Sequence, residues 1–441
     1  MPERTSWVPV APDCDWSLQN LPYGIFSTKE DSNPRVGVAI GDSIVDLAAL
    51  QDAGLLSGQL LGGATCFRQA SARGGPTLNA FMQLGLPVWE ETRGILTRLL
   101  ASEEGALRDS SAKRRSCLVA QRDATMHIPA QIPNYTDFNA SREHASAVGT
   151  MFRGPENALQ PNWLHLPIGY HGRASSIVCS GTPVRRPWGQ VRAPGADTPL
   201  WQPSAAVDFE LEMGFFIGPA NVFGAPLSLE KANDAIFGYV LVNDWSARDL
   251  QAWEYVPLGP FTSKNWATSI SPWVVSSAAL APFRVAAPHQ SPMPPAYLRS
   301  SPEELYNYGI ELEVDIVTSR QVAGGERAVA DAVTRTRMDT LYWTPAQMAA
   351  HHTVSGCLLL PGDLLASGTI SSEGPLGAGC LLEATRNGKQ RLPLPNTGAS
   401  RAWLEDGDTV VMRGHCQGDG YRVGFGECRA KLLPALDIAC L

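Results

Sequence analysis

Two short apolar runs near the start of the chain predict a β-hairpin. They lie at residues 35–40 and 43–47, and a Gly-Asp pair between them forms a typical tight turn. Further along, Pro87 opens a stretch in which Trp89 and several leucines recur at helical spacing, which predicts a helix. Residues 1 to about 120 hold no cluster of catalytic side chains, so we expect a small structural unit there.

From about residue 120 the pattern changes to strands separated by loops rich in glycine and proline. The runs that predict strands lie at residues 207–217, 236–242, 308–316 and 408–412. Short helices interrupt them: one is predicted after the N-cap Asn139 and ends near Gly149, and another begins after the cap Thr344 and ends near Gly356. This part of the chain therefore predicts one large, mostly antiparallel β domain.

Composition supports a β-rich protein. The 441 residues include 41 glycines and 34 prolines, and only 18% are charged where about 25% is usual. A net charge of -8 argues against binding to a nucleic-acid backbone, which requires a basic face.

The chain lacks the patterns that direct proteins to membranes or to secretion. No run approaches the roughly 20 apolar residues of a membrane-spanning helix, and the first residues show no basic segment leading into an apolar one. Nine cysteines without a C-x-x-C pair are typical of free thiols in a reducing compartment. We therefore expect a cytoplasmic protein with no membrane or nucleic-acid partner.

Acidic residues alternate with apolar ones in the predicted strand at residues 207–217. Glu210 and Glu212 share one face of that strand, while apolar side chains occupy the other face. The same alternation recurs at Glu311 and Glu313, and a half-exposed strand shows such a pattern without any function. Glu210 and Glu212 therefore need partners before the pattern indicates a site.

Two aspartates are candidate partners. Asp137 lies just before the predicted helix, and Asp244 ends the apolar run at residues 236–242. If these carboxylates met Glu210 and Glu212, each pair about 4 Å apart would repel by roughly 4 kcal/mol at an effective dielectric constant near 20. Only protonation or a cation would stabilise that group, and ligands that are all oxygen select Ca²⁺ or Mg²⁺.

Further candidates are a histidine and a group of donors. His144 lies seven residues after Asp137, about two turns along the predicted helix, where an imidazole beside a metal could activate water. Arg248, Gln251 and Tyr255 fall on one side of a helix, and donors of this kind suit a developing oxyanion. Lys264 follows in a loop, where a lysine is ordinarily solvated.

Several segments closely resemble the fumarylacetoacetase family, and the resemblance runs essentially from end to end. The matching segments are residues 21–27 (LPYGIFS), 135–138 (YTDF), 151–154 (MFRG), 161–176 (PNWLHLPIGYHGRASS), 243–249 (NDWSARD), 253–261 (WEYVPLGPF), 362–370 (GDLLASGTI) and 414–426 (GHCQGDGYRVGFG). The resemblance implies a mainly β fold with an N-terminal SH3-like barrel at residues 1–122. A large C-terminal β-sandwich roll of the fumarylacetoacetase type follows at residues 123–441. It also implies a homodimer.

The resemblance further implies an activity and its residues. The family hydrolyses a carbon–carbon bond of the diketo acid 4-fumarylacetoacetate, giving fumarate and acetoacetate at the last step of tyrosine and phenylalanine breakdown. The implied Ca²⁺ ligands are Asp137, Glu210, Glu212 and Asp244, and the implied Mg²⁺ site involves Asp244, Lys264 and Thr268. The implied catalytic residues are the base His144, Glu383 that orients it, and Arg248, Gln251 and Lys264 that stabilise charge. The implied substrate contacts are Asn139, Arg153, Tyr170, Gln251, Tyr255 and Thr369.

Two positions depart from the family pattern, and two alternative functions remain open. Asn139 stands where the family usually has a tyrosine that contacts substrate, and Ala267 replaces a glycine beside the Mg²⁺ loop. If position 267 requires a positive φ, alanine strains the loop. The alternatives are a related acylpyruvate hydrolase or decarboxylase, and an inactive, Ca²⁺-stabilised binding protein.

Overall fold

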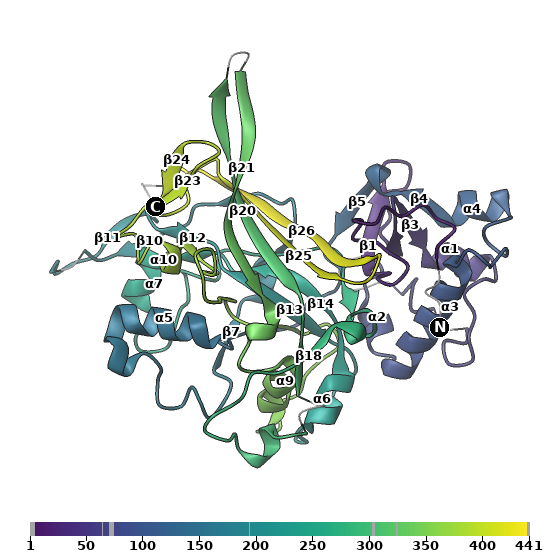
Figure 1. Ribbon diagram of the computed structural model, residues 1–441, viewed down its shortest axis with the longest axis horizontal. Helices are drawn as coiled ribbons and strands as arrows, with labels where there is room; N and C mark the ends of the chain where they lie inside the picture. The colour runs from purple at the N-terminus through teal and green to yellow at the C-terminus, as the bar shows by residue number, and fades with distance from the viewer. Residues whose placement is uncertain are drawn as a thin grey trace.

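The computed structural model describes residues 5–63, 65–69, 75–193, 195–301, 305–322 and 325–438 (Figure 1). The chain forms a smaller N-terminal unit on one side of a larger β-rich body. Within the described ranges, no helix combines the length and the apolar character that spanning a membrane requires.

A five-stranded antiparallel sheet forms the N-terminal unit. Its strands, in spatial order, are β4 (Leu118–Ala120), β3 (Ser43–Asp46), β2 (Arg35–Ile40), β1 (Tyr23–Thr28) and β5 (Ala124–His127). The predicted hairpin is confirmed, because β2 pairs with β3 in a register that places Gly37 opposite Asp46. The helices of this unit are α1 (Leu47–Asp52), α2 (Asn79–Met82), α3 (Leu86–Leu100) and α4 (Ser111–Cys117).

This sheet is strongly curled. Its two edge strands, β4 and β5, are joined only by the 3₁₀ turn η1 (Gln121–Asp123). Four strand spacings would separate the edges of a flat sheet by about 19 Å, whereas four Cα steps reach at most about 14 Å. The edges must therefore approach each other. The predicted domain boundary after residue 122 precedes β5, which is still part of this sheet.

Two larger sheets form the body. The eight-stranded sheet runs β7 (Gly169–Gly172), β6 (Tyr135–Phe138), β22 (Leu364–Ala366), β13 (Leu211–Ile217), β14 (Ile236–Asn243), β16 (Thr268–Ile270) and β8 (Ile177–Cys179), with β17 (Val275–Ser276) paired to β14. The five-stranded sheet runs β21 (Gly325–Arg337), β20 (Glu311–Val322), β25 (Thr409–Gln417), β26 (Arg422–Leu433) and β9 (Val184–Arg185). Figure 1 shows the β20–β21 hairpin projecting well beyond the body.

Short elements surround these sheets. The two-stranded pairs are β10 (Trp188–Val191) with β11 (Leu200–Pro203), β12 (Val207–Asp208) with β15 (Ser246–Ala247), β18 (Arg284–Ala286) with β19 (Tyr306–Tyr308), and β23 (Leu392–Leu394) with β24 (Ala399–Arg401). The helices are α5 (Arg142–Arg153), α6 (Leu229–Ala235), α7 (Arg248–Glu254), α8 (Ser277–Leu280), α9 (Pro345–Thr353) and α10 (Leu381–Ala384). The remaining 3₁₀ turns are η2 (Pro155–Asn157), η3 (Ala174–Ser176), η4 (Ala281–Phe283), η5 (Ala296–Leu298) and η6 (Met338–Thr340).

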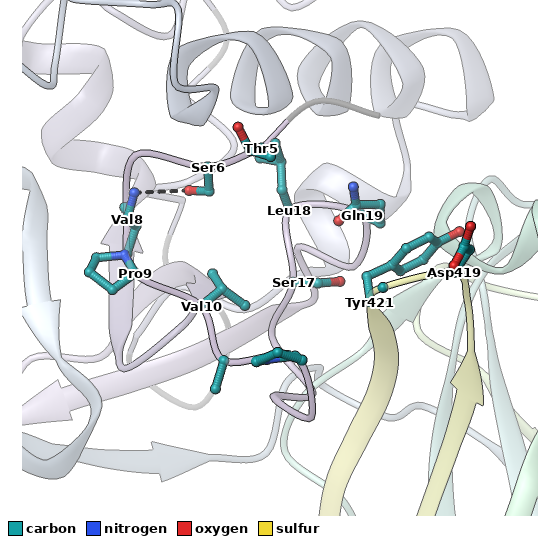
Figure 2. A pocket seen from close by; sticks show the side chains of 13 residues that line it. Thr5, Ser6, Val8, Pro9, Val10, Ser17, Leu18, Gln19, Asp419 and Tyr421 are labelled. Atoms are coloured by element: carbon teal, nitrogen blue, oxygen red, sulfur yellow. Dashed lines mark hydrogen bonds between the residues drawn. The ribbon is translucent and has the colours of Figure 1, made fainter. Parts of the chain in front are cut away.

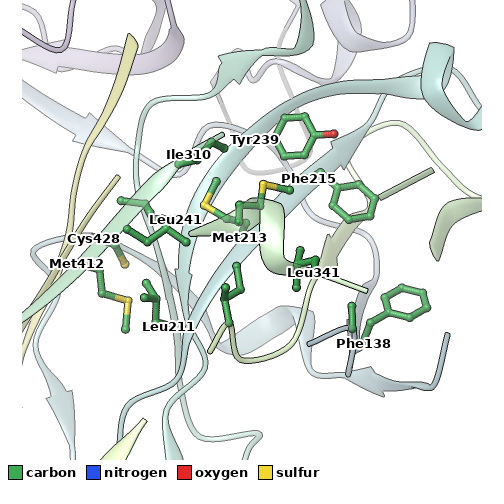
Figure 3. Close-up of a cluster of buried hydrophobic side chains, with 14 of the residues drawn as sticks. Phe138, Leu211, Met213, Phe215, Tyr239, Leu241, Ile310, Leu341, Met412 and Cys428 are labelled. Atoms are coloured by element: carbon green, nitrogen blue, oxygen red, sulfur yellow. The ribbon is translucent and has the colours of Figure 1, made fainter. Parts of the chain in front are cut away.

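The eight-stranded sheet is buried on both faces. On one face, Met213 of β13 and Leu241 of β14 pack with Met412 of the five-stranded sheet (Figure 3). On the other face, Val240 and Val242 of β14 pack into the core of the N-terminal unit. A strand covered on both sides needs apolar residues at every position, which explains the unbroken apolar run that predicted β14.

Several element predictions differ from the structure in detail, and the strand predicted at residues 408–412 is longer, because β25 continues to Gln417. Helix α5 is capped by Ser141 rather than Asn139, because the Ser141 hydroxyl accepts the backbone N–H of His144, and the helix continues to Arg153. The strand predicted at residues 207–217 is interrupted between β12 and β13, where Glu210 forms an isolated bridge with Cys380. The strand predicted at residues 308–316 is divided between β19 and β20.

Candidate metal and catalytic centre

Three of the four predicted acidic ligands meet in the body. Carboxylate oxygens of Asp137, Glu212 and Asp244 lie within 4.8 Å of one another. All three side chains are buried, with 4%, 0% and 1% of their surface exposed, respectively. This group can therefore hold a cation away from bulk water.

The register of the eight-stranded sheet explains why they meet. Along β14 and just beyond it, Val240, Val242 and Asp244 alternate onto the face that the N-terminal unit covers. Glu212 of β13 pairs with Val242 and so shares that face. Asp137 of β6 shares it too, because Tyr135, two residues earlier, packs into the same core. The carboxylates thus lie at one end of a face that is otherwise apolar.

Two of these carboxylates, Asp137 and Glu212, have oxygens without the partners that a buried negative charge needs. Asp137 Oδ1 and both carboxylate oxygens of Glu212 are buried without a hydrogen-bond partner among the described residues. Burial, followed by the charge of neighbouring carboxylates, raises the pKa of Asp137 and of Glu212 well above their usual values. An all-oxygen donor set with unpartnered oxygens fits a hard divalent cation, which would replace the missing hydrogen bonds.

Glu210 occupies a different environment from the other three acids. One of its oxygens accepts from Arg248 Nη2 at 2.7 Å, and the other accepts from Lys264 Nζ. Burial alone would raise the pKa of Glu210, but the Arg248 and Lys264 cations more than offset this effect and hold it below its usual value. Glu210 is therefore a charged partner of two cations at the edge of the group.

Lys264 is buried rather than solvated. Its side chain is 8% exposed, and its ammonium donates to Asp244 Oδ2 at 2.6 Å as well as to Glu210. Thr268 donates to the other oxygen of Asp244 at 3.2 Å, so the predicted group of Asp244, Lys264 and Thr268 is brought together. Despite the burial of Lys264, the carboxylates of Asp244 and Glu210 raise the pKa of its ammonium.

A histidine–carboxylate pair lies beside this group. His144 Nδ1 lies 2.7 Å from Glu383 Oε1 of α10, and their side chains are 12% and 7% exposed. The same oxygen accepts from Ser371 Oγ at 2.7 Å and from Cys380 Sγ at 3.3 Å. His144 is the third residue of α5 rather than two turns along it, because a strand end and a loop fill most of the interval from Asp137.

The hydrogen bond fixes the tautomer of His144. Burial would raise the pKa of Glu383, but His144 and the hydroxyl and thiol donors lower it overall, so Glu383 is ionised. An ionised carboxylate only accepts hydrogen bonds, so Nδ1 of His144 carries the hydrogen. In the neutral ring, Nε2 is then bare and can accept a proton from water.

Arg248 connects Glu210 to Gln251. Its Nε donates to Asp208 at 2.9 Å, its Nη2 donates to Glu210, and its Nη1 donates to the side-chain oxygen of Gln251 at 3.2 Å. The predicted helical neighbourhood of Arg248 and Gln251 is thus observed. The side-chain oxygen of Gln251 is therefore turned toward Arg248. Tyr255 follows the end of α7, and 55% of its surface is exposed.

The predicted substrate contacts lie in different environments. The Tyr170 hydroxyl donates to Asp244 Oδ2 at 3.1 Å, and Thr369 is buried. Arg153 lies at the far end of α5, where it donates to two backbone carbonyls of residues 157 and 158. The backbone of Asn139 bonds with Ile168 and with the Trp163 ring. Ala267 does not have a positive φ, so the strain considered for that position is absent.

Sequence reasoning missed three residues of the centre. Asp208 is fully buried and accepts from Arg248 and from the first two backbone N–H groups of α10. It precedes Glu210 by two residues, so extending the alternating pattern backwards by one step would have found it. Nothing in the local sequence marked Ser371 or Cys380, which approach Glu383 only through the fold.

One cavity of the described structure lies beside this centre, and another lies away from it. One of about 530 Å³ is lined by α5 and by residues 372–378, and it reaches Glu383. The other, of about 430 Å³, lies between residues 5–19 and the turn at residues 419–421 (Figure 2). Of the residues that line this second cavity, only Asp419 and Tyr421 are titratable, and it is not part of the acidic group.

The chain matches two known protein families and several known proteins. The family described as fumarylacetoacetate (FAA) hydrolase C-terminal matches residues 134–433, and the family described as fumarylacetoacetase N-terminal matches residues 19–129. A fumarylacetoacetase from Bos taurus is 50% identical over 98% of this chain and 100% of its own length, and one from Homo sapiens is 49% identical over 98% and 99%. A fumarylacetoacetase from Caenorhabditis elegans is 51% identical over 98% and 99%.

The fold also aligns with solved structures. A fumarylacetoacetate hydrolase from Exiguobacterium antarcticum aligns with 94% of this chain and 99% of its own, at 16% identity and a TM-score of 0.48. A similarity at this level carries no argument about activity.

Proposed function

The chain belongs to the fumarylacetoacetase family, and we propose that it hydrolyses the carbon–carbon bond of 4-fumarylacetoacetate to give fumarate and acetoacetate. The observation that carries this proposal is the buried acidic group beside the His144–Glu383 pair. Breaking this bond requires water to attack one carbonyl of the diketone while a carbanion leaves. A centre that activates water and stabilises an enolate meets both requirements.

His144 acts as the general base in this proposal. Its bare Nε2 accepts the proton of the attacking water, while Nδ1 keeps its hydrogen bond to Glu383. The Glu383 carboxylate stabilises the imidazolium that forms. A positioned general base accelerates such a step by about 10²–10⁴-fold.

Three donors stabilise negative charge. Arg248 fixes Gln251, whose amide hydrogens face the oxyanion of the tetrahedral intermediate together with the guanidinium. An oxyanion donor of this kind contributes about 3–4 kcal/mol. Lys264, which Asp244 and Glu210 keep protonated, holds the leaving enolate until a proton reaches its carbon. Asn139, Arg153, Tyr170, Tyr255 and Thr369 are the proposed substrate contacts.

We propose that Asp137, Glu210, Glu212 and Asp244 hold Ca²⁺, and that a second, Mg²⁺ site involves Asp244, Lys264 and Thr268. The unpartnered oxygens of Asp137 and Glu212 support a cation at this place. A divalent ion bound there supplies Lewis acidity toward the two oxygens of the diketone.

A variant of His144 tests the proposed activity. We expect His144→Ala to reduce kcat by at least about 10²-fold, because the base is lost, and to leave Ca²⁺ binding by calorimetry unchanged. Loss of the diketone absorbance of fumarylacetoacetate reports turnover, and His289→Ala, which removes a histidine that belongs to neither group of the centre, is the matched control. Near wild-type turnover in His144→Ala would eliminate His144 as the base. Faster turnover of an acylpyruvate or of oxaloacetate by the wild-type protein would favour the related hydrolase or decarboxylase.

We also propose three properties of the whole protein. Its curled N-terminal sheet is an SH3-like barrel, and the body is a β-sandwich roll of the fumarylacetoacetase type. The protein is a homodimer. Its molar mass, measured by light scattering after size-exclusion chromatography, tests this proposal. It is cytoplasmic, a proposal supported by the eight free thiols of the described ranges, with Cys440 lying outside them.

A further inference from the structure

We propose that a borderline-soft divalent cation, of the class of Zn²⁺ or Cd²⁺, binds His144, Cys380 and Glu383 and thereby inhibits the enzyme. This site is distinct from the acidic group, since it shares no residue with Asp137, Glu212 and Asp244. The inhibition rests on the proposed function of His144, whereas the binding does not.

The geometry supplies three ligand atoms of different kinds. A ring nitrogen of His144, Cys380 Sγ and an oxygen of Glu383 all lie within 4.8 Å of one another. Glu383 Oε1 is 2.7 Å from His144 Nδ1 and 3.3 Å from the sulfur. Ligand atoms around a tetrahedral zinc stand about 2.0–2.3 Å from the metal, so small side-chain shifts would admit one ion. Ser371 Oγ, 2.7 Å from the same carboxylate oxygen, lies where it can complete the set.

The chemistry of the donors separates the two neighbouring sites. Asp137, Glu212 and Asp244 offer only oxygen, which Ca²⁺ and Mg²⁺ prefer. A thiolate and an imidazole with one carboxylate instead favour Zn²⁺ and heavier ions of similar softness. An excess of Ca²⁺ or Mg²⁺ should therefore fill the first site and leave the second available.

A path from solvent reaches the proposed site. The cavity of about 530 Å³ is lined by Glu383 together with Arg142, Glu143, Ser146 and Glu373. Its two further carboxylates favour the approach of a cation over that of an anion. Cys380 itself is fully buried, so access through Glu383 is the route that the structure offers.

The proton balance explains why binding inhibits. The metal bonds to the lone pair of Nδ1 after the hydrogen of that nitrogen moves to Nε2, and the thiol releases its proton to solvent as the metal–sulfur bond forms. No oxidation or reduction takes place. Nε2 then carries a hydrogen and cannot accept the proton of water, so the ion removes the base while leaving the other side chains of the centre in place.

Cd²⁺ added to the protein in the presence of excess Mg²⁺ is the direct test. We expect one equivalent to produce the near-ultraviolet charge-transfer band of a cadmium–thiolate bond, with turnover falling in parallel. Cys380→Ser should remove the band and raise the Cd²⁺ concentration for half inhibition at least about tenfold, since losing even an outer partner of a metal ligand costs about 10–100-fold. Each variant is compared with its own activity without Cd²⁺.

Cys357→Ser is the matched control, because Cys357 is more accessible than Cys380 and belongs to no such group among the described residues. It should keep both the band and the inhibition. The proposal is overturned if Cys380→Ser retains the full band, or if it is inhibited at the same Cd²⁺ concentration as the wild type. If Cys380→Ser fails to fold, ¹¹³Cd NMR of the wild-type protein is the test instead. A ¹¹³Cd chemical shift found only in the range of all-oxygen ligands would overturn the proposed site. Band and NMR are independent of turnover, so they test the site even if the proposed activity is wrong.

Discussion

Arg248 neutralises two buried carboxylates at once. Asp208 and Glu210 are both buried, and each accepts a hydrogen bond from the same guanidinium. Removing one partner of such a buried ion pair lowers the free energy of unfolding by more than the pair contributes to it. The other charge is then left without compensation in the protein interior. The stability of the centre should therefore depend strongly on this single side chain.

We predict that Arg248→Met lowers the free energy of unfolding by about 3–5 kcal/mol. Urea denaturation of the metal-loaded protein measures the change. Arg335→Met is the matched control, since Arg335 pairs with Glu313 at a site where the arginine is 65% exposed. That surface pair should contribute no more than about 1 kcal/mol. Equal effects of the two substitutions would contradict the role given to Arg248.

The same pattern of residues has two different meanings in this chain. Glu210 and Glu212 are buried in the body, whereas Glu311 and Glu313 stand on a solvent-facing side of β20. Alternation predicted that each pair shares a face, and no local feature could say which face would be covered. Likewise, the sequence around Lys264 is that of a loop, and its buried partners Asp244 and Glu210 lie 20 and 54 residues away along the chain.

At the scale of elements, α5 must approach the segment that follows it very closely. A Cβ at Gly149 would stand 1.6 Å from the carbonyl oxygen of Ala158. Since α5 also carries His144, any displacement of this helix changes the distance between His144 and Glu383. Gly94 in α3 is different, because nothing lies within 4 Å of a Cβ placed there.

We predict opposite effects of one substitution in these two helices. Gly94→Ala should raise the free energy of unfolding by about 0.5–1 kcal/mol, the usual gain of alanine over glycine in a helix. Gly149→Ala should lower both the free energy of unfolding and kcat, because the helix must shift to avoid the carbonyl. Thermal unfolding and steady-state assays distinguish them, and a stabilised, fully active Gly149→Ala would show that the close approach is unimportant.

Elements with strong local signals could be predicted from sequence. The hairpin β2–β3 and helix α9, with its Thr344 capping box, begin and end close to the predicted residues, and helix α3 begins beside the predicted Pro87. The cap of α5 was misplaced because Asn139 and Ser141 are both good caps, and the backbone bond from Asn139 to Ile168 keeps the former outside the helix. Sheet order could not be predicted, since the pairings of β6 with β22, β8 with β16 and β9 with β26 join segments far apart along the chain.

At the scale of the whole molecule, the acidic group couples metal binding to stability. The pKa of Asp137 and of Glu212 is raised in the folded protein, so without metal the folded state binds more protons than the unfolded state. The contribution of these two carboxyls to the free energy of unfolding is fully present below about pH 4. It is lost as pH rises toward the pKa values of the folded state. A bound cation would remove this penalty by pairing with the ionised forms.

We therefore predict that chelation lowers the Tm and the activity, and that the loss of Tm is larger at about pH 8 than at about pH 5. Scanning calorimetry with and without EDTA measures the difference. The variant with Asp137→Asn and Glu212→Gln should show little change of Tm with EDTA at either pH. A chelated wild-type protein with unchanged activity and Tm would contradict a cation at this group.

The shared core between the N-terminal unit and the eight-stranded sheet has a consequence for how the protein can be divided. Phe216, Val240, Val242 and Leu364 of the body rest against that unit, so a shortened chain starting near residue 130 would present them to water and aggregate. Supplied as a separate chain, residues 1–129 should rescue the truncated body by covering this face. The two regions would then behave as complementing fragments of one enzyme rather than as exchangeable modules.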